Sequence, residues 1–162
     1  MEILQTIWTA LTTENETLTK IFASFLMFIE LYVSMLLFIT ILKIPANKKQ
    51  KILYVLLLSL IGILNLWIIP TPYNTFINLI ACPILVHFIF KTNLLKSILA
   101  EIIPYIVFVL LGSILVNIYT ILSGIPTNSF VIVPIHKFLF SILMYSCVYF
   151  FIFFAILESG IK

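Results

Sequence analysis

The segment that most constrains the fold runs from Phe138 to Leu157, which is twenty residues long and contains no charged side chain. A helix needs about 20 apolar residues to cross the hydrocarbon core of a bilayer, and this segment has that length. The chain as a whole is 63% hydrophobic and 9% charged, whereas a soluble domain is about half apolar and about a quarter charged. A small soluble fold could not hide so much apolar surface, so the protein is expected to lie in a membrane.

Four other apolar segments resemble this one. They cover approximately residues 18–42, 52–70, 75–90 and 97–122. Because a helix satisfies its backbone hydrogen bonds internally, each segment is predicted to be helical in lipid. The predicted fold is all-α: a polytopic transmembrane helical bundle of about five spans, the third of them short. The transmembrane domain covers residues 18–157. An extracytoplasmic or interfacial segment, 1–17, precedes it and a cytoplasmic tail, 158–162, follows it.

The lysines indicate how this bundle is oriented. The loop before the second segment reads KIPANKKQK and the loop before the fourth reads KTNLLK, whereas the other two connections, TPYN and SGIPTNSFVIVPIHK, hold only Lys137. Short lysine-rich loops stay on the cytoplasmic side of a membrane. The N-terminus is therefore predicted to lie outside and the C-terminus inside. Seven lysines, Lys162 included, are cytoplasmic in this topology, and Lys20 and Lys137 are not. The expected location is a bacterial cell membrane, as a multi-pass protein whose main partner is the lipid bilayer.

The N-terminal segment has its own apolar pattern. Ile3, Ile7, Trp8 and Leu11 recur at roughly helical spacing. A short helix lying at the membrane interface, with Trp8 among the lipid headgroups, is the predicted structure.

Three polar residues of the apolar segments are predicted to lie at a similar depth. Glu30 stands thirteen residues before Lys43, Asn65 fourteen residues after Lys51, and Asn78 thirteen residues before Lys91. At a rise of ~1.5 Å per residue these separations are each ~20 Å. A charged side chain at that depth costs at least ~2.5 kcal/mol and therefore needs a partner or a proton. The three residues are expected to form an interhelical hydrogen-bonded layer, acting either as a switch or ion-sensing site or as plain helix-to-helix attachment.

A second polar pair is predicted near the cytoplasmic interface. His87 stands four residues before Lys91, and Glu101 five residues after Lys96. Across the short loop between them the two side chains could meet, or each could extend separately to water. Pro104, three residues further on, permits a kink in the fourth segment.

Catalytic and metal-binding patterns are weak. Cys82 and His87 are five residues apart and so point about 140° away from each other on a helix, and Cys147 and His136 are separated by ~16 Å along one. A membrane thiol peptidase is therefore disfavoured, and the chain is predicted not to be an enzyme. It has no glycine-rich phosphate loop, and its two histidines lie in different segments, so no cofactor and no metal are expected. Nine lysines against six glutamates do not indicate a nucleic-acid partner.

The connection IIPTPYNTF, residues 68–76, is predicted to be an extracytoplasmic turn. Pro70 ends the second helix, and Asn74 or Thr75 is expected to cap the third. This turn also brings rigid aromatic side chains to one rim, which suits peptide binding at low entropic cost. The predicted signal-binding residues are Trp67, Tyr73, Asn74 and Phe76.

Several stretches in order resemble a known family. They are KKQK before ILYVLLL, then IPTPYNTFINLI, then FKTNLLKSILAEIIPYIVFVLLGSIL, then VPIHKFLFSILMY. Over roughly residues 30–150 the chain resembles the membrane sensor region of AgrC-like sensor histidine kinases, whose catalytic part is a GHKL-type ATPase. The resemblance implies a quorum-sensing receptor of a two-component system, which detects an extracellular signal, often a peptide, and controls a cytoplasmic kinase. The 162 residues contain no phospho-acceptor or ATP-binding motif. The expected partners are therefore a kinase or a second copy of the chain.

Two other functions fit the residues. A small membrane transport or substrate-binding subunit would use the intramembrane layer as its site, and a membrane assembly protein would need no ligand. A carrier predicts a polar pocket deep in the bundle, whereas a receptor predicts an outward-facing groove.

Overall fold

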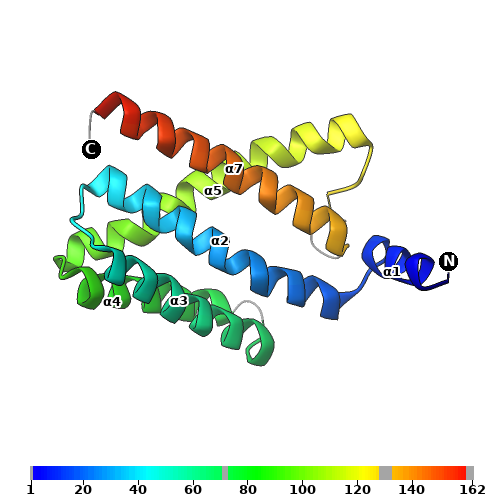
Figure 1. Ribbon diagram of the computed structural model, residues 1–162, viewed down its shortest axis with the longest axis horizontal. Coiled ribbons are helices and arrows are strands. Elements are labelled where there is room, and N and C mark those ends of the chain that lie inside the picture. The colour runs from blue at the N-terminus through cyan, green and yellow to red at the C-terminus, as the bar shows by residue number, and fades with distance from the viewer. Residues whose placement is uncertain (1, 71–72, 128–132, 160–162) are drawn as a thin grey trace.

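The computed structural model describes residues 2–70, 73–127 and 133–159, and the elements found in them are all helices (Figure 1). Their bounds are α1 Glu2–Thr12, α2 Glu16–Leu42, α3 Lys48–Ile68, α4 Tyr73–Phe90, α5 Leu94–Ser123 and α7 Pro134–Ser159. Four of them, α2, α3, α5 and α7, are long and apolar enough to cross a membrane. The apolar part of α4, Phe76–Phe90, is shorter. The predicted all-helical membrane bundle is confirmed, with four helices of spanning length and a fifth that is shorter.

Asparagine side chains fix the beginnings of three helices. Asn15 accepts a hydrogen bond from the backbone N–H of Leu18 at 3.0 Å, and Asn93 accepts one from that of Lys96 at 2.9 Å. Asn47 and Gln50 form a reciprocal capping box at the start of α3. Each cap satisfies a backbone donor that the first helical turn leaves unpaired.

The start of α4 differs from the prediction. The helix begins at Tyr73, so Asn74 and Thr75 lie inside its first turn and do not precede it. The side chains of Asn74 and Thr75, on which the predicted capping role depends, lie outside the described part of the structure. The turn itself is closed by a hydrogen bond from the backbone N–H of Tyr73 to the carbonyl of Pro70, at 3.0 Å.

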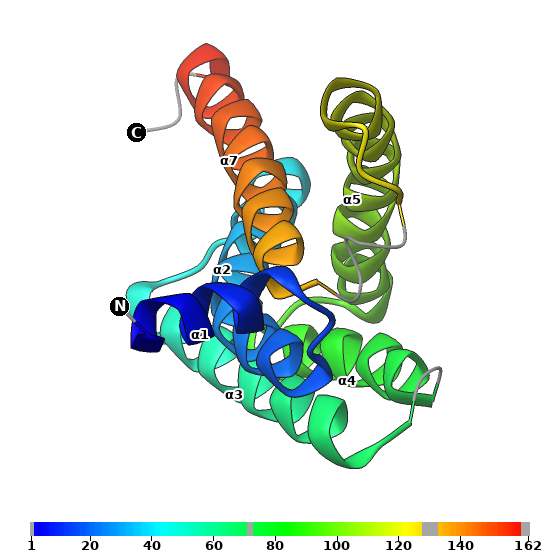
Figure 2. The same cartoon turned by 90° about the vertical axis from the view of Figure 1, so that its right-hand side faces the viewer.

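Helix α2 is the centre of the bundle. It packs against α3, α5 and α7, and α4 lies between α3 and α5 (Figures 1 and 2). One buried cluster joins α2, α3, α4 and α5 around the rings of Phe38, Tyr54 and Phe90, whose centroids are 5.5–5.9 Å apart. A second cluster joins α2 to α7 through Leu26, Tyr145 and other apolar side chains. Large apolar side chains also cover the outside of the bundle, as expected for helices that face lipid.

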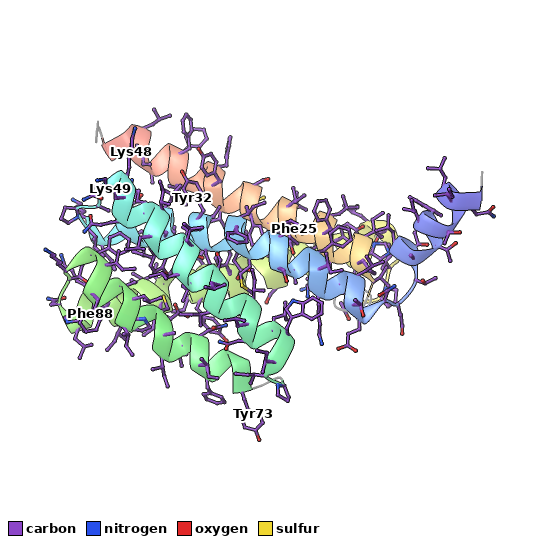
Figure 3. All side chains as sticks on the ribbon, turned by 60° about the horizontal axis from the view of Figure 1, so that its bottom comes forward. Phe25, Tyr32, Lys48, Lys49, Tyr73 and Phe88 are labelled. Atoms are coloured by element: carbon purple, nitrogen blue, oxygen red, sulfur yellow. The ribbon has the colours of Figure 1, made fainter. Side chains whose placement is uncertain are left out.

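The two lysine-rich loops lie at the same end of the bundle. Residues 43–47 connect α2 to α3 and residues 91–93 connect α4 to α5, both at the left of Figure 1, and Lys48 and Lys49 mark this end in Figure 3. Near these loops the Gln50 amide links α3 to α4 by donating to the carbonyl of Ile89 at 2.7 Å. At the opposite end lie α1, the end of α3 and the start of α4. That this opposite end faces outward stays a prediction from the lysines.

Candidate functional site

A small polar cavity of about 80 Å³ lies between four helices of the bundle. Helix α2 contributes Glu30, α4 contributes Asn78 and Cys82, and α5 contributes Glu101. Its apolar walls are Met27, Leu31, Leu58 and Gly62. The volume is sufficient for a few water molecules, since one needs roughly 10–15 Å³ of accessible space. A peptide could not enter it.

The cavity brings together part of the predicted polar layer. The Asn65 side-chain amide donates to the Asn78 side-chain oxygen at 2.9 Å, which joins α3 to α4. Glu30 lines the same cavity as Asn78, but its carboxylate is hydrogen-bonded in another direction. It accepts from the hydroxyl of Tyr145 on α7, at 2.8 Å. The layer therefore consists of an asparagine pair and a separate Glu30–Tyr145 pair.

Of the two alternatives for His87 and Glu101, the described structure does not contain the direct contact: His87 lies on an exposed face and Glu101 lines the cavity. The buried face of α4 carries Cys82, Val86 and Phe90 at four-residue spacing, and His87 follows Val86 on an exposed face. The His87 ring nitrogen Nδ1 contacts the carbonyl of Thr92 at 2.6 Å. Glu101 points into the bundle instead, because it lies four residues after the buried Ser97 and three before the buried Pro104, on the side of α5 that packs inward.

Cys82 links Glu101 to a third helix. The Cys82 thiol is 3.1 Å from the hydroxyl of Tyr54 on α3, and both side chains are buried. The thiol also interacts with the Glu101 carboxyl group. Within the described ranges, no group of three or more His, Cys, Asp or Glu side chains could hold a metal ion.

Tyr145 was not among the residues predicted from the sequence. It lies within the charge-free segment that defines the last span, and its ring packs edge-on against Phe108 of α5 with centroids 5.9 Å apart. A signal for it exists, because Lys137, Ser141 and Tyr145 recur every four residues and so form one polar stripe along an apolar helix. Lys137 is also close enough to act electrostatically on Glu30.

A larger groove lies at the end of the bundle opposite the lysine-rich loops. It has a volume of about 450 Å³ and runs between the start of α2 and the end of α3. Its lining residues are Glu16, Lys20, Leu66, Trp67, Ile68, Ile69 and Pro70. The Trp67 indole N–H donates to the hydroxyl of Ser24 on α2 at 3.2 Å, which orients the ring, while 48% of the residue stays exposed. The groove thus combines an oriented aromatic side chain with both signs of charge.

Two of the other predicted signal-binding residues lie at this end of the bundle. Tyr73 and Phe76, in the first turn of α4, are 66% and 62% exposed, and Tyr73 projects away from the bundle in Figure 3. The side chain of Asn74 lies outside the described part of the structure. The structure therefore places Trp67 in the groove and the aromatic side chains of Tyr73 and Phe76 on the surface at the same end.

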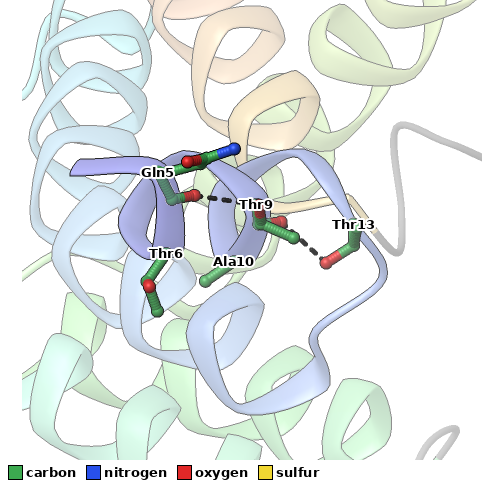
Figure 4. A pocket seen from close by; sticks show the side chains of 5 residues that line it. All are labelled: Gln5, Thr6, Thr9, Ala10 and Thr13. Carbon is green, nitrogen blue, oxygen red and sulfur yellow. Dashed lines mark hydrogen bonds between the residues drawn. The ribbon is translucent and has the colours of Figure 1, made fainter. Parts of the chain in front are cut away.

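The concave surface beside α1 is a weaker candidate (Figure 4). Its lining residues, Gln5, Thr6, Thr9, Ala10 and Thr13, all come from α1 and the turn after it. The Thr9 and Thr13 hydroxyls already donate to backbone carbonyls of the preceding turn, at 2.9 and 2.7 Å. With one helix supplying the whole lining, this surface offers a ligand no opposing wall.

No protein-family model, curated protein or solved structure matches this chain. The groove and the cavity are therefore the features of this chain that bear on its function.

Proposed function

We propose that this chain is the membrane sensor module of a two-component-type system, which binds an extracellular peptide and relays its presence to a cytoplasmic kinase. The observation that carries the proposal is the groove between α2 and α3, lined by Trp67, Lys20 and Glu16. It lies at the end that the lysine distribution assigns to the outside. At about 450 Å³ it can take one or two side chains of a peptide, whereas the cavity of about 80 Å³ cannot.

The chemistry of the groove suits a peptide that has an apolar side chain beside a polar or charged group. The Lys20 ammonium group is 2.7 Å from the Glu16 carboxylate, which is exposed. A carboxylate of the ligand can replace Glu16 as the partner of Lys20. The Trp67 ring, oriented by Ser24, offers an apolar surface that loses little rotamer freedom on binding. Tyr73 and Phe76 extend the aromatic surface onto α4.

The groove is connected to the lysine-rich end through α2. Ser24, which holds Trp67, lies near the start of this helix, and Lys43 follows its end. Because α2 packs against α3, α5 and α7, a ligand that shifts α2 relative to α3 changes packing along the whole bundle. The ends of α2 and α7 at the lysine-rich side then present the change to a kinase partner.

Fluorescence tests the binding step directly, because the chain has two tryptophans, Trp8 and Trp67. In a Trp8→Phe variant reconstituted in nanodiscs, Trp67 is the single tryptophan reporter of the groove. The probe is the peptide fraction of spent medium from the source culture, with fresh medium as the blank. We expect a saturable change in Trp67 emission, weakened by a further Tyr73→Ala or Lys20→Gln substitution.

The matched control is Phe88→Ala, which removes an equally exposed aromatic side chain of α4 at the other end of the bundle (Figure 3). It should leave the titration unchanged. A titration that shows no response, or one that Phe88→Ala weakens as much as Tyr73→Ala does, would overturn the receptor assignment.

The intramembrane cavity favours a second candidate function, a small membrane transport subunit. Two carboxyl groups in the membrane are typical of ion and proton pathways. The cavity volume limits such a substrate to a proton or a small ion. Ion flux in proteoliposomes that responds to Glu30→Gln, without any response of the groove to spent medium, would favour this function.

A further inference from the structure

The two carboxyl groups of the cavity come from different helices and have different partners. Glu30 of α2 is held by the hydroxyl of Tyr145 on α7, and Glu101 of α5 lies beside the Cys82 thiol of α4. Both line the same space of about 80 Å³. A proton could therefore pass from one carboxyl group to the other across the cavity through one or two water molecules.

The groups that surround the cavity balance only one negative charge. From α7, Tyr145 donates a hydrogen bond to Glu30, and Lys137 supplies a positive charge at longer range. From α4, Asn78 and Cys82 are uncharged polar groups, and Tyr54 of α3 is hydrogen-bonded to that thiol. Among the residues that the structure describes, the ion pair is Lys20–Glu16, and neither Glu30 nor Glu101 takes part in one.

Two ionised carboxylates beside each other in an apolar region repel strongly, because the low dielectric constant barely screens them. When two carboxyl groups occupy one such site, a single proton shared between them removes the repulsion and adds a hydrogen bond. Each carboxyl group has one polar partner of its own, the Tyr145 hydroxyl at Glu30 and the Cys82 thiol at Glu101, so either group can hold the shared proton.

We propose that Glu30 and Glu101 share one exchangeable proton across this cavity, which makes it a proton-binding site within the membrane. Loss of the proton leaves two negative charges between α2 and α5 and loosens the packing of those helices. The site is separate from the groove at the end of α3, so the proposal does not depend on the sensor function.

Infrared spectroscopy of the chain in nanodiscs tests this, because a protonated carboxyl group has a carbonyl-stretch band that a carboxylate lacks. We expect the wild type at neutral pH to show such a band that shifts in heavy water, and we expect the Glu30→Gln, Glu101→Gln double variant to lose it. The control is Glu14→Gln, which removes an exposed glutamate in the turn before α2 and should leave the band unchanged.

The single variants test whether the two groups act as a pair. Each single variant, Glu30→Gln or Glu101→Gln, leaves one carboxyl group whose proton affinity can be measured alone. If the two groups share a proton, the proton affinities of the wild type differ by at least about tenfold from those expected for two such independent groups. A wild-type titration that matches two independent groups would overturn the proposal. The absence of a protonated-carboxyl band from the wild type at neutral pH would also overturn it. That second result needs no variant, so it stands even if a substitution prevents folding. If sodium chloride abolishes the band and choline chloride does not, the cavity binds a sodium ion in place of the proton, and the proposal of a proton site is overturned.

Discussion

The contribution of the Tyr145–Glu30 hydrogen bond to stability can be measured by removing the Tyr145 hydroxyl oxygen. Tyr145→Phe deletes the hydroxyl that donates to Glu30 at 2.8 Å and keeps the ring that packs against Phe108. An interhelical hydrogen bond in a membrane contributes about 0.6 kcal/mol on average and about 1.7 at most. A buried acceptor that loses its donor adds a desolvation penalty of about 1–3 kcal/mol. Because Glu30 keeps only the distant Lys137 as compensation, we expect a destabilisation of about 1–2 kcal/mol.

The assay is reversible unfolding in mixed micelles by increasing fractions of SDS, followed by circular dichroism. Tyr149→Phe is the matched control, since it removes the same hydroxyl one turn later on α7 from a residue that is 50% exposed. Tyr149→Phe should change the free energy of unfolding by less than about 0.5 kcal/mol, as most surface substitutions do. Tyr145→Phe should therefore be distinguishable from it at the precision of such measurements.

A double-mutant cycle identifies the partner. In a Glu30→Leu background the Tyr145 hydroxyl no longer has its acceptor, so Tyr145→Phe should cost about 1 kcal/mol less there than in the wild type. An equal cost in both backgrounds would refute the reasoning, because the hydroxyl would then stabilise the bundle through some other contact. Glu30→Gln keeps an acceptor oxygen and should be milder than Glu30→Leu.

The remaining predictions concern packing and topology. Asn78→Leu should destabilise the bundle by about 0.6–1.7 kcal/mol in the same assay, because it removes the acceptor of the Asn65 amide; a neutral result would show that the pair contributes nothing. Gly62→Ala should cost about 1 kcal/mol, since the new methyl group meets the Met27 sulfur and that flexible side chain must move, and Gly62→Leu should cost more. If Leu is tolerated as well as Ala, α2 and α3 are not closely packed there. Single cysteines at positions 45–50 should react with an impermeant thiol reagent only after the cells are permeabilised, because the lysines hold this loop inside; labelling in intact cells would reverse the topology.

The helices follow from the sequence because their causes are local. A run of about 20 apolar residues forms a helix in lipid whatever surrounds it. Asn47 and Asn93 cap their own helices through residues three positions away. The meeting of Asn65 and Asn78 also follows, because neighbouring antiparallel helices joined by a short turn place residues of equal depth side by side. Counting from Lys51 and Lys91 is enough to find that depth.

Only the tertiary structure decided which way each polar side chain points and which helix it meets. Glu30 lines the cavity together with Asn78, yet its hydrogen-bond partner is Tyr145, 115 positions later in the chain, because α7 packs against α2. The distances to Lys91 and Lys96 allowed Glu101 and His87 either to meet or to extend separately to water, but the rotation of α5 turns Glu101 into the cavity and the rotation of α4 turns His87 outward. Depth is a property of one helix and can be counted along it. Rotation and neighbours are set by how the apolar faces of all the helices pack together, and faces this uniformly apolar leave little sign of that choice in the sequence.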